Sequence, residues 1–197
     1  MKKLLSRTIT ILLCAAFIII AAQTHAADIK KDDIEDTMAG VKLGTKIEEL
    51  KMKFPNIYKN QLFAGEVLYE ACNQKQLEVF SFTEEPWSKG YITNIWVRKE
   101  EESVCRDSTG SLPDYSIVAA TPRGVKLGDK EENVIRLYGQ PTSSKIVKDG
   151  EKILTFKAKS GRKDVIVRNL VLYFTISNGY VTSFHLVSDM PGAKKPF

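Results

Sequence analysis

The sequence predicts an α+β protein made of two tandem repeats, each a short helix packed on a roughly four-stranded antiparallel sheet. The pentapeptide Gly-Val-Lys-Leu-Gly occurs at 40–44 and again at 124–128. The motif Gly-Tyr-x-Thr also occurs twice, at the same place in each copy, at 90–93 and 179–182. The predicted segments are a signal peptide (1–26), a lead-in (27–39), repeat unit 1 (40–98), a connector (99–123), repeat unit 2 (124–187) and a C-terminal tail (188–197).

A short amphipathic helix is predicted after each pentapeptide. Thr45 and Asp129 stand at matching positions, and either side chain can accept a hydrogen bond from the first turn of a helix. A glutamate follows three residues later in both copies, as in a capping box. Pro55 and Gly139 are expected to end the two helices. Apolar residues recur at helical spacing between these signals: Ile47, Leu50 and Phe54 in the first copy, and Val134, Leu137 and Tyr138 in the second.

Strands are predicted to fill the rest of each unit. Ala64-Gly65 and Asp149-Gly150 indicate tight turns between β-prone runs. Further runs follow at 77–83 and 170–175, and Asn178-Gly179 predicts the turn into the last strand. One unit alone is too small to bury much apolar surface, so we expect the two units to share a core.

The N-terminus is typical of a secretory signal. Lys2, Lys3 and Arg7 precede an apolar run that extends from Ile9 to Ala22. This run is short for a membrane span, and small residues follow it. We expect cleavage after Ala26, which places the protein in the periplasm or outside the cell without stable membrane insertion. The alternative is an uncleaved N-terminal membrane anchor.

The cysteines predict one disulfide. Of the three cysteines, Cys14 leaves with the signal peptide, and Cys72 and Cys105 remain. An even number of cysteines in an exported chain favours a Cys72–Cys105 bond. The alternative is two unpaired buried thiols.

Charge and motifs indicate neither a nucleic-acid partner nor an enzyme. Cleavage removes three of the 29 basic residues and none of the 24 acidic ones, which leaves a net charge of +2. A charge this small predicts no nucleic-acid partner. The sequence has no Gly-x-Ser-x-Gly, His-Glu-x-x-His or phosphate-loop motif, and its mature part has one histidine, His185. We therefore predict no catalytic residue, no metal and no cofactor.

The segment "VKLGDKEENVIRLYGQP" resembles the helix motif of the small outer-membrane SmpA/OmlA lipoproteins. The tandem arrangement more closely resembles the β-lactamase inhibitor protein family, in which two such units lie side by side. The chain departs from the SmpA/OmlA pattern because it lacks the lipoprotein cysteine and has two units. What the resemblance implies is a binding fold for a protein partner, whose identity it does not give.

Alternation along the strands predicts an uncovered sheet face. The face expected beneath the helices holds Tyr91, Thr93, Ile95 and Val97 in one unit, and Tyr180, Thr182, Phe184 and Leu186 in the other. The opposite face holds Ile92, Asn94, Trp96 and Arg98, and Val181, Ser183, His185 and Val187. Tyr173 is expected to join this second face, since Leu172 and Phe174 belong to the core. Two alternatives remain: the connector could cover this face, and the loop residue Trp87 could be either packed or exposed.

The candidate binding surface therefore comprises Trp96, Tyr173, His185, Arg98 and Trp87. Aromatic and arginine side chains dominate the energetics of protein interfaces. We expect an exported, non-catalytic protein-binding module of the cell envelope. The alternatives are an accessory of envelope or outer-membrane assembly, and a carrier of a small ligand in a pocket between the repeats. A broad exposed patch would favour the first, and a deep apolar pocket the last.

Overall fold

The computed structural model describes residues 34–100, 106–107, 110–111, 115, 117–147, 150–159 and 169–189. All of them belong to one compact unit, Asp32–Phe197. The predicted signal peptide, Cys105 and Asp149 lie outside the described residues, so the predictions made for them remain predictions.

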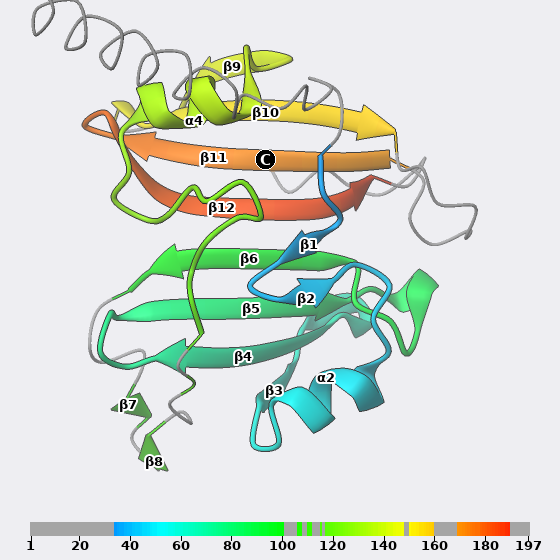
Figure 1. The fold of residues 1–197 in the computed structure, drawn as a ribbon. Helices are drawn as coiled ribbons and strands as arrows, with labels where there is room; N and C mark the ends of the chain where they lie inside the picture. The colour runs from blue at the N-terminus through cyan, green and yellow to red at the C-terminus, as the bar shows by residue number, and fades with distance from the viewer. Residues whose placement is uncertain are drawn as a thin grey trace, which may run out of the picture. The chain divides into compact units, whose positions relative to one another are not determined.

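Eight strands form one antiparallel sheet in the order β3-β4-β5-β6-β12-β11-β10-β9 (Figure 1). Their bounds in that order are Tyr58–Gln61, Val67–Asn73, Glu78–Glu84, Asn94–Lys99, Tyr180–Asp189, Asn169–Ser177, Lys152–Lys159 and Ser143–Ile146. The α-helices are α2 (Ile47–Lys53) and α4 (Glu131–Tyr138), and the 3₁₀ turns are η1 (Phe63–Gly65) and η2 (Pro86–Ser88). Two short ladders pair β1 (Thr37–Met38) with β2 (Val41–Lys42), and β7 (Arg106–Asp107) with β8 (Gly110–Ser111).

The prediction of two tandem helix-on-sheet repeats is wrong, because the described strands of both halves form a single large sheet. The last strand of each half pairs with the other: β6 joins β12 antiparallel over five residue pairs, from Ser183↔Arg98 to Val187↔Asn94. An unpaired edge strand exposes a row of backbone N–H and C=O groups. Pairing β6 with β12 satisfies two such edges at once and leaves β3 and β9 as the outer strands.

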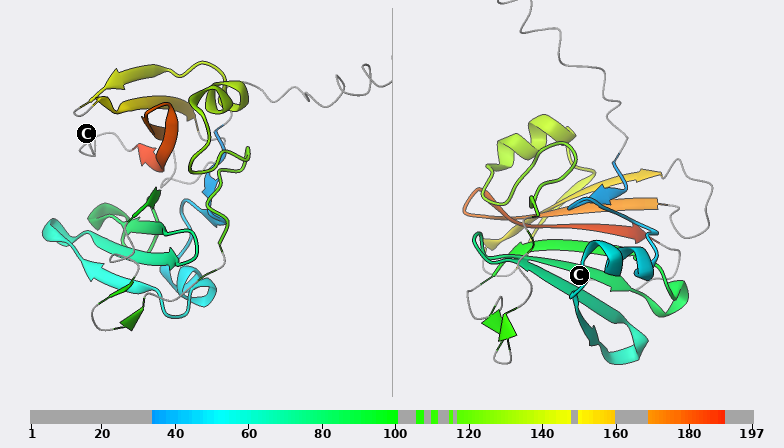
Figure 2. Two further views of the ribbon diagram at one scale, coloured as in Figure 1. Left: turned by 90° about the vertical axis from the view of Figure 1, so that its left-hand side faces the viewer. Right: turned by 60° about the horizontal axis from the view of Figure 1, so that its bottom comes forward.

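One hydrophobic core extends beneath both halves of this sheet. The Phe54 ring, which follows α2, stacks on Phe82 of β5 with centroids 5.6 Å apart. At the other end of the core, Tyr138 of α4 lies 5.6 Å from Phe156 and 5.4 Å from Phe174. Figure 2 (left) shows α2, α4 and the β1–β2 ladder on the same side of the sheet. We call the opposite side the open face.

The first residue of each helix is hydrogen-bonded to the turn that precedes the last strand of the same half. The N–H groups of Ile47 and Glu131 each donate to a glycine carbonyl, that of Gly90 or Gly179, at 3.0 Å. The predicted side-chain caps are wrong: the N-cap residues are Lys46 and Lys130, and neither makes a side-chain cap bond. The turn carbonyls satisfy the first N–H groups that a capping side chain would otherwise bind.

The turns agree with the sequence where they are described, and the strand faces agree in part. Asn178 and Gly179 have φ angles of 51° and 81°, as a tight hairpin turn requires. Alternation predicts Ile92 and Val181 on the open face, but both are buried in the core. Tyr180, assigned to the covered face, is exposed. Ile92 precedes β6, and an irregularity between Thr175 and Ile176 shifts the register of β11 against β12 near Val181. Alternation counted from the motif therefore fails at these positions.

Candidate functional site

A straight row of paired residues crosses the open face from one edge of the sheet to the other. The pairing places Trp96 opposite His185, and His185 opposite Tyr173. At a strand spacing of about 4.8 Å, a row over eight strands extends about 33 Å. We call this set the transverse row; its members are Tyr58, Glu70, Ser81, Trp96, His185, Tyr173, Thr155 and Ser143.

Three aromatic side chains lie next to one another at the centre of this row. The His185 ring is 6.1 Å from the Trp96 ring on one side and 6.1 Å from the Tyr173 ring on the other. Trp96 is 38% exposed. Burial of the imidazole lowers the pKa of His185 to about 4, because the cationic form loses its hydration. At neutral pH His185 therefore contributes an uncharged aromatic surface with one donor and one acceptor nitrogen.

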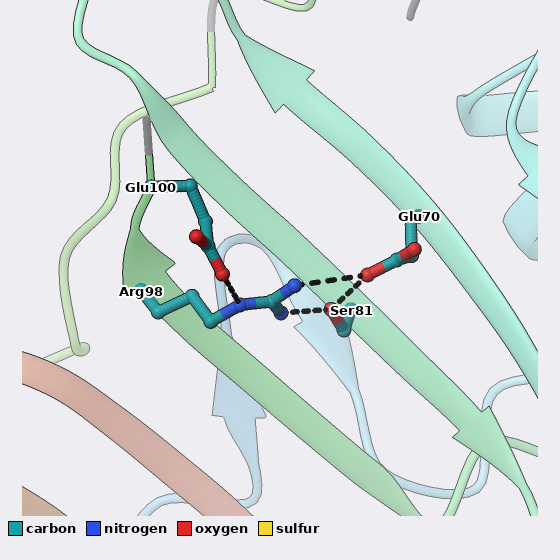
Figure 3. A network of polar contacts seen from close by, with 4 residues as sticks. All are labelled: Glu70, Ser81, Arg98 and Glu100. Carbon is teal, nitrogen blue, oxygen red and sulfur yellow. Dashed lines mark hydrogen bonds and ion pairs between the residues drawn. The ribbon is translucent and has the colours of Figure 1, made fainter. Parts of the chain in front are cut away.

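Arg98 lies beside this aromatic group, and three polar contacts hold its guanidinium in place (Figure 3). Its Nε lies 2.5 Å from Glu100 Oε1, and its Nη2 lies 3.2 Å from Glu70 Oε1. Its Nη1 donates to Ser81 Oγ at 2.6 Å, and Ser81 Oγ donates to Glu70 at 2.9 Å. The guanidinium carbon also lies 4.4 Å from the centre of the Trp96 ring. Two carboxylates compensate the charge of Arg98, so this side chain positions Trp96 and is not a free cation.

A groove of about 410 Å³ lies on the open face beside the transverse row. Trp87 borders it from η2 and is 41% exposed, so the interpretation of this residue as a packed plug is wrong. Tyr173 is not among the lining residues. These residues come from both halves of the chain: Leu62, Glu66, Leu68, Glu70, Ser81, Thr83, Glu85, Trp87, Asn94, Trp96, Arg98, His185, Val187 and Ser188.

The groove contains three carboxyl groups that no sequence motif indicates. Glu85 accepts a hydrogen bond from Asn94 Nδ2 at 2.9 Å. Burial raises the pKa of Glu85, and the neighbouring Glu66 carboxylate raises it further. Glu66 and Glu70 lie on other segments of the same half. Glutamates are frequent throughout this chain, and only the register between strands brings these three into one groove.

The described part of the connector contacts both faces of the sheet: Glu100 engages Arg98 on the open face, while a later stretch packs on the other side. Tyr115 Oη accepts a hydrogen bond from the Asn56 N–H at 3.0 Å, and the Tyr115 ring lies edge-on to Phe54 at 5.0 Å. Ala119 is buried in the same core. Tyr115 and Ala119 therefore belong to the covered face, and Trp96 keeps its partial exposure.

A second hollow, of about 740 Å³, lies between the β4–β5 turn and the connector. Its lining is polar and apolar in nearly equal parts: Asn73, Lys75, Gln76, Glu78, Lys99, Ile117, Val118, Ala119, Lys126 and Leu127. Burial raises the pKa of Glu78. Such a lining differs from the deep apolar pocket that a carrier of a small apolar ligand would require.

Cys72 is fully buried and takes part in a disulfide. Its bonding partner lies outside the described residues, so the pairing with Cys105 remains a prediction. Among the described residues, no group of histidine, cysteine, aspartate and glutamate side chains could hold a metal ion. No helix in this part of the chain is long and apolar enough to cross a membrane.

No family model matches this chain, and no curated protein matches it. One similar solved structure is an extracellular protein containing an SCP domain from Bacillus anthracis str. Ames. The identity is 13%, the match covers 75% of this chain and 44% of that protein, and the TM-score is 0.41. Another is a cysteine-rich secretory protein from Staphylococcus aureus subsp. aureus Mu50, with 14% identity, 80% and 48% coverage, and a TM-score of 0.40.

The expected resemblance to the SmpA/OmlA and β-lactamase inhibitor protein families is therefore wrong. No model of either family matches, and the described strands form one sheet where two units side by side were expected. This chain spans less than half the length of either structure, 44% and 48%. At TM-scores of 0.41 and 0.40, these likenesses carry no argument about activity or partners.

Proposed function

We propose that this chain is an exported, non-catalytic module that binds a protein partner through the open face of its sheet. The observation that carries the proposal is the pair of exposed indoles, Trp87 and Trp96, bordering a groove that no described helix covers. Large aromatic side chains that remain exposed beside a concave surface are typical of protein-binding sites.

The surface also has the composition of an interface. Aromatic rings lie at its centre, and charged or polar side chains surround them. Arg98 and its carboxylate partners fix the position of Trp96 before any partner arrives. A side chain that is ordered in advance loses less conformational entropy on binding. The open face therefore supports recognition of a partner with little rearrangement.

Site-specific photo-crosslinking in intact cells tests this proposal. A photoreactive phenylalanine at position 96 or 173 should give one discrete protein adduct, which mass spectrometry can identify. The same amino acid at position 180 is the matched control, because Tyr180 is exposed but belongs neither to the groove lining nor to the transverse row. If all three positions give the same adducts, or none, binding through the open face is excluded.

Export rests on the predicted signal peptide and needs its own test. The intact mass of the protein recovered from the envelope or the medium should correspond to cleavage after Ala26. A full-length mass in the membrane fraction would instead show an N-terminal anchor. That result would change the location of the module and would leave the test of its binding face unaffected.

A further inference from the structure

One end of the groove carries negative charge that the described lining does not neutralise. Glu66 and Glu85 both line the groove and share a side-chain hydrogen bond, and neither has an ion pair within the described part of the chain. Arg98 lies in the same lining, but Glu70 and Glu100 already engage its guanidinium. This pair of carboxyl groups therefore has no cation beside it among the described residues.

Two turns bring these carboxylates together with an exposed indole. A Cβ atom added at Gly65 in η1 would lie 3.6 Å from Pro86 Cγ in η2, so the two turns are in contact. Glu66 directly follows η1, Glu85 directly precedes η2, and Trp87 lies within η2. Asn94 ties Glu85 to β6, two residues before Trp96. The groove is thus lined by these carboxyl groups together with two exposed indoles.

Building on the proposed function, we propose that this groove binds an extended segment of the partner protein. One Lys or Arg side chain of that segment contacts the indoles of Trp87 and Trp96 and the carboxyl groups of Glu66 and Glu85. An indole face attracts a cation through its quadrupole, and a carboxylate supplies a charge-assisted hydrogen bond. A peptide segment fits better than a free small cation. The transverse row continues beyond Trp96 for about half the width of the sheet, so adjacent residues of a segment would have further surface to contact.

Selection from a random peptide library tests the proposal directly. The full chain serves as bait beside two double variants, Glu66→Gln/Glu85→Gln and the control Glu49→Gln/Glu132→Gln. The control removes the same charge from exposed positions on the two helices. The unmodified chain and the control should enrich peptides with a basic residue at a fixed position. The groove variant should lose that enrichment.

A selected peptide then allows a titration. Trp87 and Trp96 are the only tryptophans of the chain, so fluorescence reports on the groove alone. Replacing the selected Lys or Arg with norleucine should weaken binding to the unmodified chain by about tenfold or more, about 1.4 kcal/mol. The same replacement should change binding to the groove variant by less than twofold. Equal binding of both peptides to the unmodified chain overturns the proposal, as does a library that yields no peptide dependent on Glu66 and Glu85.

The outcomes separate this inference from the proposed function. If the selected peptides lack a basic residue but still lose binding on Trp96→Ala, the open face binds proteins and only the cation site is wrong. If Trp96→Ala leaves all peptide binding unchanged, the proposed function fails as well. The C-terminal tail, which lies outside the described residues, carries Lys194 and Lys195. If Lys194→Gln/Lys195→Gln strengthens binding of the basic peptide, the chain's own tail is the occupant, and a partner segment is excluded.

Discussion

Replacing Arg98 with methionine tests whether the polar network on the open face contributes to stability as its geometry indicates. Methionine keeps an apolar stem of similar length but removes the guanidinium. The Arg98 and Glu70 side chains are 16% and 18% exposed, so water screens their ion pair only in part. Ser81, which also accepts from Arg98, is 2% exposed and has little access to replacement water.

The expected cost combines three losses. A partly screened ion pair contributes about 1 kcal/mol, and leaving Glu70 and Ser81 with fewer hydrogen bonds costs about another 1 kcal/mol. The cation–π contact with Trp96, at 4.4 Å, adds roughly 0.5 kcal/mol. The remaining apolar contacts of methionine offset part of this sum. We therefore expect the free energy of unfolding to fall by about 2 kcal/mol.

Urea unfolding followed by tryptophan fluorescence gives the measurement. With a slope of about 2 kcal/mol per M, a loss of that size moves the midpoint down by about 1 M. The variants Glu70→Gln and Arg98→Met/Glu70→Gln complete a double-mutant cycle, and we expect a coupling of about 1 kcal/mol. A midpoint shift below about 0.3 M, or a coupling near zero, would refute the reasoning from the network.

Other predictions concern the core, the titration of the open face, the disulfide and one turn. Phe174→Ala removes a fully buried ring beneath the sheet and should lower the free energy of unfolding by about 3–5 kcal/mol, measured by urea unfolding; a loss under about 1 kcal/mol would contradict its place in the core. The folded pKa of His185, about 4, is below its ordinary value of 6.5, so its stabilising contribution is complete above pH 6.5 and is lost as pH falls toward 4. His185→Gln should therefore reduce the pH dependence of stability in that window by at most about 1.4 kcal/mol per pH unit; an NMR titration midpoint near 6.5 would contradict this. Non-reducing peptide mapping should recover Cys72 joined to Cys105, and free thiols at both positions would exclude that bond. Gly90 has a φ of 88°, so Gly90→Ala should cost about 1 kcal/mol by thermal unfolding, and an unchanged melting temperature would show that the turn relaxes freely.

Local features of the fold could be predicted because short segments determine them. The helix that ends at Gly139 and the hairpin at Asn178-Gly179 both rest on residues whose backbone preferences act within a few positions. The helix caps could not be predicted in this way. Their first N–H groups bind the carbonyls of Gly90 and Gly179, which are about 43 and 48 residues away along the chain. A sequence with good capping residues gives no sign that a distant turn will take their place.

The candidate site, like the fold, could be predicted only where local sequence determines it. Alternation within a strand correctly indicated that Trp96 and Arg98 share one face, and that His185 lies on the same side of the sheet. It could not show that Arg98 is held by Glu70 and Glu100, because that contact depends on how β4, β5 and β6 align. Arg98 therefore lies in the candidate surface with its guanidinium already engaged by two carboxylates.

The error in the fold class and the origin of the candidate site have one cause, the pairing of β6 with β12. Trp96 belongs to β6 and His185 to β12, and they are directly paired across this junction. Two separate sheets would place these side chains on different edges, each beside unpaired backbone groups. Joining the edges creates a continuous open face, brings Trp96 within 6.1 Å of His185, and lets a groove form from residues of both halves. A substitution that separates β6 from β12 should therefore abolish recognition by the open face even if each half keeps its own hairpins.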